Sequence, residues 1–233
     1  MARKYKIAYT EKQKNAHLIA WVFLWFFVFY LLYTLLTTFV FSTRALESDT
    51  MRPELHAGDR FISSSYSSLL NRTLPLRYGN IVIIDKSRQK PRNIADSLLE
   101  GVLRFFTAQQ VSLSKQDEDL YIKRVIGLPG DEITMTNYVF RVKRRGDPYS
   151  YTEFELAEKP YDVTIPPGSA LWDESLPFSG NMGPIVLSDN ECFVLSDDRN
   201  NTNDSRTWGP VSLDLIAGKV VFRYWPIFRI GIP

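Results

Sequence analysis

The chain has 233 residues, which is enough for one globular domain with an appended segment or for two small domains that share a core. Its 28 Lys and Arg residues against 26 Asp and Glu residues leave a net charge of only +2, which is too even to indicate nucleic-acid binding. Cys192 is the only cysteine, so an intramolecular disulfide is excluded. With His17 and His56 as the only histidines, a histidine metal cluster or a Ser-His-Asp triad is hard to assemble, and a hydroxyl nucleophile needs another base.

Residues 18–41 form an almost unbroken apolar run, and residues 15–43 contain no Asp, Glu, Lys or Arg. A helix needs about 20 apolar residues to cross a bilayer, so this run predicts a transmembrane anchor. A buried core helix would show a polar face, and a cleavable signal peptide would have a shorter apolar run. Five basic residues and one acidic residue precede the run. Positive-inside bias then predicts a single-pass protein with residues 1–17 in the cytoplasm and residues 44–233 on the far side of the membrane.

The exported part consists of short runs of Val, Ile, Phe and Tyr divided by Gly, Pro, Asn and Asp, a pattern typical of β-strands. Strands are predicted at 80–85, 139–143, 184–188, 192–196 and 218–225. Parallel βαβ units would need helical patterns between the strands, and only one such pattern occurs. The sequence therefore predicts a mainly β, largely antiparallel domain.

The single helical pattern lies at 94–113, inside a predicted insertion at about 86–119. This amphipathic helix either packs on the β core or lies on the bilayer beside the anchor, and the sequence leaves both alternatives open. A second, loop-rich insertion is predicted at about 144–183, where Pro, Gly, Ser and acidic residues are frequent.

Three polar stretches stand out from this pattern. They read SDTMRPELHAGDRF (48–61), YIKRVIGLPGDEI (121–133) and SDDRNNTNDSRTWGPV (196–211). The LPGD sequence alone indicates a tight turn, because Pro sets one dihedral and Gly allows a positive φ. The KR pair alone is typical of two solvated side chains, and the DSR sequence alone of a surface ion pair.

Taken in order, the three stretches resemble those of the type I signal peptidases. These membrane-anchored Ser/Lys-dyad proteases have a catalytic Ser just before Met-x-Pro, a general-base Lys in a KR...G.PGD stretch and a supporting GD.R..S.DSR stretch. The resemblance implies a signal-peptidase-like β fold and a nucleophile at Thr50, immediately before Met51. It implies Lys123 as the general base. The chain departs from the family at the nucleophile, which is usually Ser.

The same resemblance assigns four further residues. Ser48 would join the backbone N–H of the nucleophile in the oxyanion hole, and Thr202 would orient the lysine. Asp204 and Arg206 would hold the loop that carries Thr202. The implied function is a membrane-bound endopeptidase that removes signal peptides from exported pre-proteins at the cytoplasmic membrane, with no metal or cofactor. The implied partners are these pre-proteins and the lipid bilayer, and no nucleic acid.

The chemistry of a Lys base sets a condition on this site. A free Lys has a pKa near 10.4, so burial must lower the pKa of Lys123 by several units before the amine is neutral at pH 7. The branched side chain of Thr50 restricts its rotamer, and the unbranched Ser48 two residues earlier stays open as an alternative nucleophile. A catalytically silent anchored homologue is the main alternative function. A cytosolic self-cleaving repressor with a Ser/Lys dyad is a third, which the predicted anchor argues against.

Overall fold

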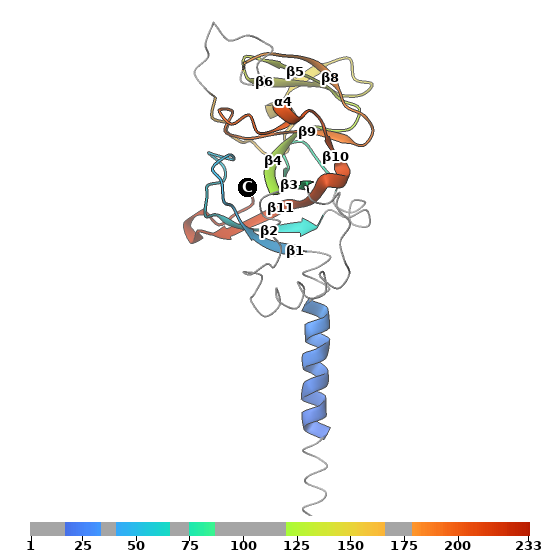
Figure 1. The fold of residues 1–233 in the computed structure, drawn as a ribbon, viewed down its shortest axis with the longest axis vertical. Helices are drawn as coiled ribbons and strands as arrows, with labels where there is room; N and C mark the ends of the chain where they lie inside the picture. Colours follow the sequence, from blue (N-terminus) through green and yellow to red (C-terminus); the bar gives the residue numbers. More distant parts are fainter. Residues whose placement is uncertain (1–16, 34–40, 66–74, 87–119, 166–178) are drawn as a thin grey trace, which may run out of the picture. The chain divides into compact units, whose positions relative to one another are not determined.

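The chain divides into two compact units, Met1–Val40 and Phe41–Pro233. The structure is a computed structural model, and it describes residues 17–33, 41–65, 75–86, 120–165 and 179–233 (Figure 1). In the first unit a helix covers residues 17–33, and its apolar side chains are exposed, Phe23 to 69%. Within the described ranges, no helix has both the length and the apolar character that a membrane crossing requires. Residues 34–40 of the expected anchor lie outside these ranges.

The larger sheet of the second unit has seven strands in the order β1-β2-β11-β3-β4-β9-β10. Their bounds are β1 (Phe41–Ala45), β2 (Arg60–Ser65), β3 (Ile81–Asp85), β4 (Leu120–Gly127), β9 (Glu191–Leu195), β10 (Val211–Ser212) and β11 (Ile216–Trp225). Every pairing in it is antiparallel, as the sequence predicted. The strands predicted at 80–85, 192–196 and 218–225 are confirmed as β3, β9 and β11.

A smaller antiparallel sheet has four strands in the order β7-β6-β5-β8 (Figure 1). They are β5 (Glu132–Thr136), β6 (Val139–Lys143), β7 (Ser150–Thr152) and β8 (Met182–Val186). Apolar and charged residues alternate along β6, so one face of this strand packs on the core. Phe140 and Val142 are fully buried, while Arg141 and Lys143 face solvent. The strands predicted at 139–143 and 184–188 are confirmed as β6 and β8.

The described helices of the second unit are each a single turn: α3 (Glu153–Leu156), α4 (Ser205–Trp208), η3 (Leu213–Leu215) and η4 (Ile227–Arg229). The amphipathic helix predicted at 94–113 lies outside the described residues. Of the predicted loop-rich insertion at 144–183, the structure describes β7, α3 and the first residues of β8, while residues 166–178 lie outside.

Two buried clusters position the polar stretches. One packs Met51 and Leu55 against Phe61 of β2 and Ile83 of β3, under the 48–55 segment. The other joins the two sheets. It contains Ile126, Ile133, Met135, Phe140, Val142, Tyr161, Leu187, Phe193 and Leu195. Between β4 and β5 the LPGD turn forms as expected, with Gly130 at φ 86°.

Candidate active site

Lys123 lies on β4, a central strand of the larger sheet, opposite Val82 of β3. Its side chain is buried, with only 1% exposed. Nζ donates a hydrogen bond of 2.8 Å to Oγ of Ser196, which is also buried and directly follows β9. The centroid of the Trp208 ring lies 5.9 Å from Nζ. The lysine is therefore enclosed by strand, loop and indole ring, and it is not a solvated side chain.

Burial lowers the pKa of Lys123 to about 8, because the ammonium loses its hydration. The carboxylates of Asp204 and Asp197 oppose this change, and the cations Arg206 and Lys86 add to it. At pH 7 roughly a tenth of such an amine is neutral, against less than about one in a thousand for a free lysine. The burial therefore makes the amine a usable general base near neutral pH.

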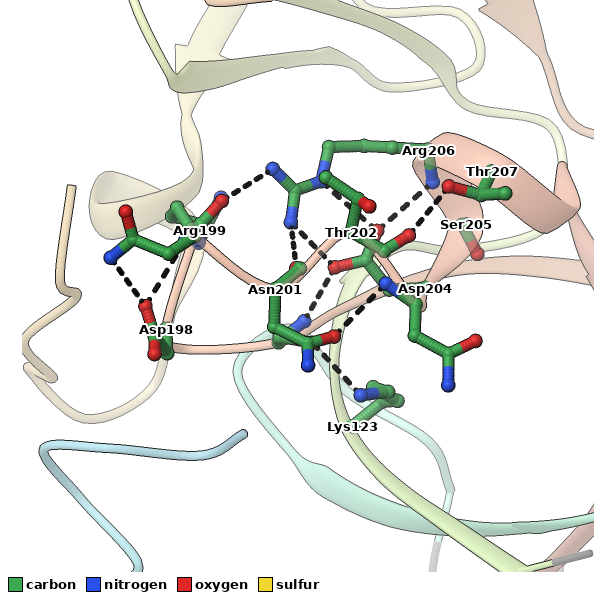
Figure 2. A network of polar contacts seen from close by, with 12 residues as sticks. Lys123, Asp198, Arg199, Asn201, Thr202, Asp204, Ser205, Arg206 and Thr207 are labelled. Atoms are coloured by element: carbon green, nitrogen blue, oxygen red, sulfur yellow. Dashed lines mark hydrogen bonds and ion pairs between the residues drawn. The ribbon is translucent and has the colours of Figure 1, made fainter. Parts of the chain in front are cut away.

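Asp204 and Arg206 form a buried ion pair in the loop after β9, with an N···O distance of 2.8 Å (Figure 2). Oδ2 of Asp204 also accepts a hydrogen bond of 3.0 Å from the N–H of Ser196. Nη1 of Arg206 donates to the carbonyl of Arg199 at 3.0 Å, and Nη2 donates to the carbonyl of Asn201. The buried pair therefore cross-links the backbone of the loop at several points, which a surface ion pair would not do.

The hydroxyls of Ser48 and Thr50 lie next to each other, with their oxygens 3.2 Å apart. The segment that carries them forms a turn, in which the N–H of Leu55 donates to the carbonyl of Met51 at 2.8 Å. Met51 and Leu55 are fully buried, whereas Thr50 is half-buried and Ser48 is exposed. The buried side chains anchor the turn, and both hydroxyls stay within reach of solvent or a substrate.

Backbone contacts join this turn to the loop after β9. The carbonyl of Thr50 accepts a hydrogen bond of 3.1 Å from the N–H of Asp198. The neighbouring Asp197 accepts two bonds, at 2.7 Å and 2.6 Å, from Arg124, which directly follows Lys123 on β4. Within the described residues, no direct hydrogen bond joins Thr50 Oγ1 to Lys123 Nζ. The structure thus brings all three polar stretches together, with hydroxyl pair and amine on adjoining segments.

One expected contact needs correction. Thr202 was expected to orient Lys123, but the hydroxyl that accepts from Lys123 is that of Ser196. In the described part of the chain, Thr202 instead offers its carbonyl to the N–H of Asp204 at 2.8 Å and to Oγ1 of Thr207 at 2.6 Å. Ser196 stands where the family stretch begins with Gly, and this departure is the sequence signal that could have identified it.

Comparison with known families gives the context for this arrangement. The family model described as "Signal peptidase, peptidase S26" matches residues 18–225. The chain belongs to the signal peptidase family. This signal peptidase is similar to the probable signal peptidase I-2 of Synechocystis sp., at 30% identity over 195 residues, which cover 84% of this chain and 68% of the relative.

Two further relatives match this signal peptidase over a similar length. Signal peptidase I of Bacillus caldolyticus is 30% identical over 190 residues, which cover 81% of both chains. Signal peptidase IB of Staphylococcus aureus is 26% identical over 188 residues, which cover 81% of this chain and 80% of the relative. Membership of this peptidase family makes the chain a hydrolase of the serine-protease type, and the family match spans all three polar stretches.

Proposed function

We propose that this signal peptidase removes signal peptides from exported pre-proteins, with Thr50 as nucleophile and Lys123 as general base. The observation that carries the proposal is the buried Lys123 amine, whose pKa is lowered to about 8, beside the loop that binds the Thr50 backbone. A hydroxyl becomes a competent nucleophile only when a base takes its proton during attack. A neutral lysine amine provides that base without a histidine.

The reaction is acyl transfer in two steps. Oγ1 of Thr50 attacks the scissile carbonyl carbon while its proton passes to Nζ of Lys123. The resulting ammonium returns the proton to the leaving amine, which departs with the mature protein, and the signal peptide remains as an ester on Thr50. Water then attacks the ester with Lys123 again as base, which releases the signal-peptide carboxylic acid and frees Thr50.

Ser48 completes the site as an oxyanion donor in this proposal. Its hydroxyl lies 3.2 Å from Oγ1 of Thr50 and faces solvent, so it can turn toward an oxygen that develops negative charge at the attacked carbon. The N–H of Thr50 is the second donor. Thr202, Asp204 and Arg206 support the site by shaping the loop after β9, in which the Asp204–Arg206 ion pair is buried.

The membrane arrangement forms part of the proposal. Residues 1–17 lie in the cytoplasm, residues 18–41 form a single transmembrane anchor, and residues 44–233 form the catalytic domain on the extracytoplasmic side, with insertions at about 86–119 and 144–183. The basic residues before the apolar run and the exposed apolar side chains of helix 17–33 support this arrangement. An anchored enzyme meets its pre-proteins at the bilayer that they cross.

Cleavage of a pre-protein by the detergent-solubilised full chain tests the proposal. Wild type is compared with Thr50→Ala, Lys123→Ala and Ser48→Ala, and cleavage is followed by the appearance of the mature protein. We expect Thr50→Ala and Lys123→Ala to lose cleavage. Full cleavage by Thr50→Ala would assign the nucleophile elsewhere, first to Ser48. A folded wild type that binds the pre-protein without cutting it would mean a silent homologue.

A further inference from the structure

The hydrogen bond between Lys123 and Ser196 lies in the interior of the described domain. Both side chains are buried, to 1% and 0% exposure, and the two atoms lie 2.8 Å apart. A lysine amine in such a place has few acceptors, because water is excluded and the nearest carboxylates are engaged elsewhere. Asp204 bonds to Arg206 and the Ser196 N–H, and Asp197 bonds to Arg124.

The backbone of Ser196 is also fixed by a hydrogen bond. Its N–H donates to Oδ2 of Asp204 at 3.0 Å, and that carboxylate is fixed by Arg206 through three N–H donors. The serine hydroxyl therefore sits on a backbone that the buried ion pair keeps in place. The hydrogen bond that Nζ donates to this hydroxyl limits rotation of the flexible lysine side chain and restricts the direction in which the lone pair of the neutral amine points.

The sequence makes this contact unusual for the family. The family stretch quoted above begins with Gly, which has no side chain, and here that position carries Ser196. The hydroxyl of the same stretch that was expected to meet the lysine is replaced by Thr202, whose described contacts are made by its carbonyl. The two departures occur in one loop, six positions apart in the sequence.

We propose that Ser196 is the positioning residue for the general base, because its hydroxyl holds the Lys123 amine in the direction of Thr50. The expected effect on the cleavage rate rests on the proposed function. The contact itself can be tested without activity, through the titration of the Lys123 amine. The Ser196 side chain is fully buried and accepts the hydrogen bond from Lys123. It acts through Lys123, in the place of the hydroxyl that the family stretch supplies at position 202.

Removing the hydroxyl has two expected effects. The ammonium form loses its hydrogen-bond acceptor, so the pKa of Lys123 falls further, while Asp204, Asp197, Arg206 and Lys86 still act on it as before. The neutral amine loses its orientation, so kcat falls although more amine is neutral. A mutation that only loosens the packing around Lys123 would instead admit water and raise the lowered pKa, which is the opposite direction.

The test compares Ser196→Ala with Ser205→Ala in the full chain. Ser205 is a matched control, since it is a buried serine at the start of α4. Its Oγ accepts from the N–H of Val194 at 3.0 Å, and no hydrogen bond of the described residues joins it to Lys123. The Lys123 amine is titrated through its side-chain 13C resonance in selectively labelled protein, and kcat and KM for a pre-protein are measured against pH. Ser196→Gly, the family residue, removes the same hydroxyl and serves if the Ala variant does not fold.

For Ser196→Ala we expect kcat to fall on the order of tenfold to a hundredfold with little change in KM. The acidic limb of its pH profile and the lysine titration should both move to lower pH, while Ser205→Ala keeps both midpoints. Unchanged titration and kcat in Ser196→Ala, with both altered in Thr202→Val, would return the role to Thr202 and overturn the inference. If wild type does not cleave, the proposed function fails, and the shift in the titration alone still decides whether Ser196 holds the amine.

Discussion

The backbone carbonyl of Thr50 accepts a hydrogen bond of 3.1 Å from the backbone N–H of Asp198. This contact joins the turn that carries the proposed nucleophile to the loop that holds Lys123 through Ser196. Since only backbone atoms take part, the contact does not depend on which side chain occupies position 50. Changes of the Thr50 side chain can therefore separate chemistry from folding.

Replacing Thr50 by Ser should preserve cleavage, because the hydroxyl stays and the loss of the methyl group widens the choice of rotamers. Thr50→Ala should lower kcat to background while both variants keep the wild-type melting temperature within a few degrees. Rates with a pre-protein and thermal unfolding by fluorescence check this. A large drop in melting temperature for Thr50→Ala would show that the side chain also has a structural role.

Cleavage should depend on pH through Lys123. Its pKa is lowered to about 8, mainly by burial, so kcat/KM should rise as the pH increases through about 8 and level off once the amine is neutral. The sign follows from the role of a base, which acts only after it has lost its proton. A pH–rate profile at subsaturating pre-protein tests this. A rate that falls over the same range would contradict a lysine base.

Lys123→Met should stabilise the folded domain at neutral pH. The pKa of Lys123 in the folded state, about 8, lies below the ordinary lysine value of 10.5, so the folded state binds fewer protons than the unfolded state between these pH values. Below pH 8 the wild type should therefore be less stable than the Met variant, by on the order of 3 kcal/mol. This difference should shrink as the pH increases from about 8 to 10.5. Denaturant unfolding of both proteins at neutral and alkaline pH measures the difference. A constant difference at all pH values would mean that Lys123 has the same pKa in the folded and unfolded states, which would contradict a lowered pKa.

Ser48→Ala should reduce kcat by about 10²–10³ with little effect on KM, since an oxyanion donor acts mainly in the transition state. Ser48 is exposed, so the substitution should leave stability almost unchanged. Steady-state kinetics with a pre-protein measure both constants. Loss of cleavage to background in Ser48→Ala, with cleavage retained in Thr50→Ala, would instead fit Ser48 as the nucleophile.

Glu153→Gln should be strongly destabilising, because Glu153 and Arg199 form an ion pair with side chains 0% and 1% exposed. Breaking a buried pair leaves the partner charge uncompensated, at a cost of about 3 kcal/mol. Asp189→Asn is the control. It breaks the Arg145–Asp189 pair, whose side chains are 66% and 81% exposed, and should cost less than about 1 kcal/mol. Unfolding free energies compare the two, and similar small costs would rule out a stabilising role for the buried pair.

The sequence predicted the strands well where burial alternates or runs without interruption, as in β6 and β3. It also predicted a buried environment for Lys123, because an apolar run follows this residue. It assigned the orienting hydroxyl to Thr202 and missed Ser196. A stretch of sequence gives the order of the hydroxyls, but which of them reaches Nζ depends on the path of the loop after β9. That path is set by the bonds that the buried Asp204–Arg206 pair makes to the backbone of Ser196, Arg199 and Asn201, and no periodicity reveals them.

Lys123 and Thr50 differ in how firmly the surrounding backbone holds them. Lys123 lies on β4, which is hydrogen-bonded on both sides, whereas Thr50 lies in the turn between β2 and the edge strand β1. Local opening is cheapest where fewer backbone bonds must break. We therefore expect the Lys123 amine to stay in place when an extended substrate binds, and the turn that carries Ser48 and Thr50 to adjust. Amide exchange should be slowest around 123 and faster across 48–54, and substrate should slow it mainly in the latter.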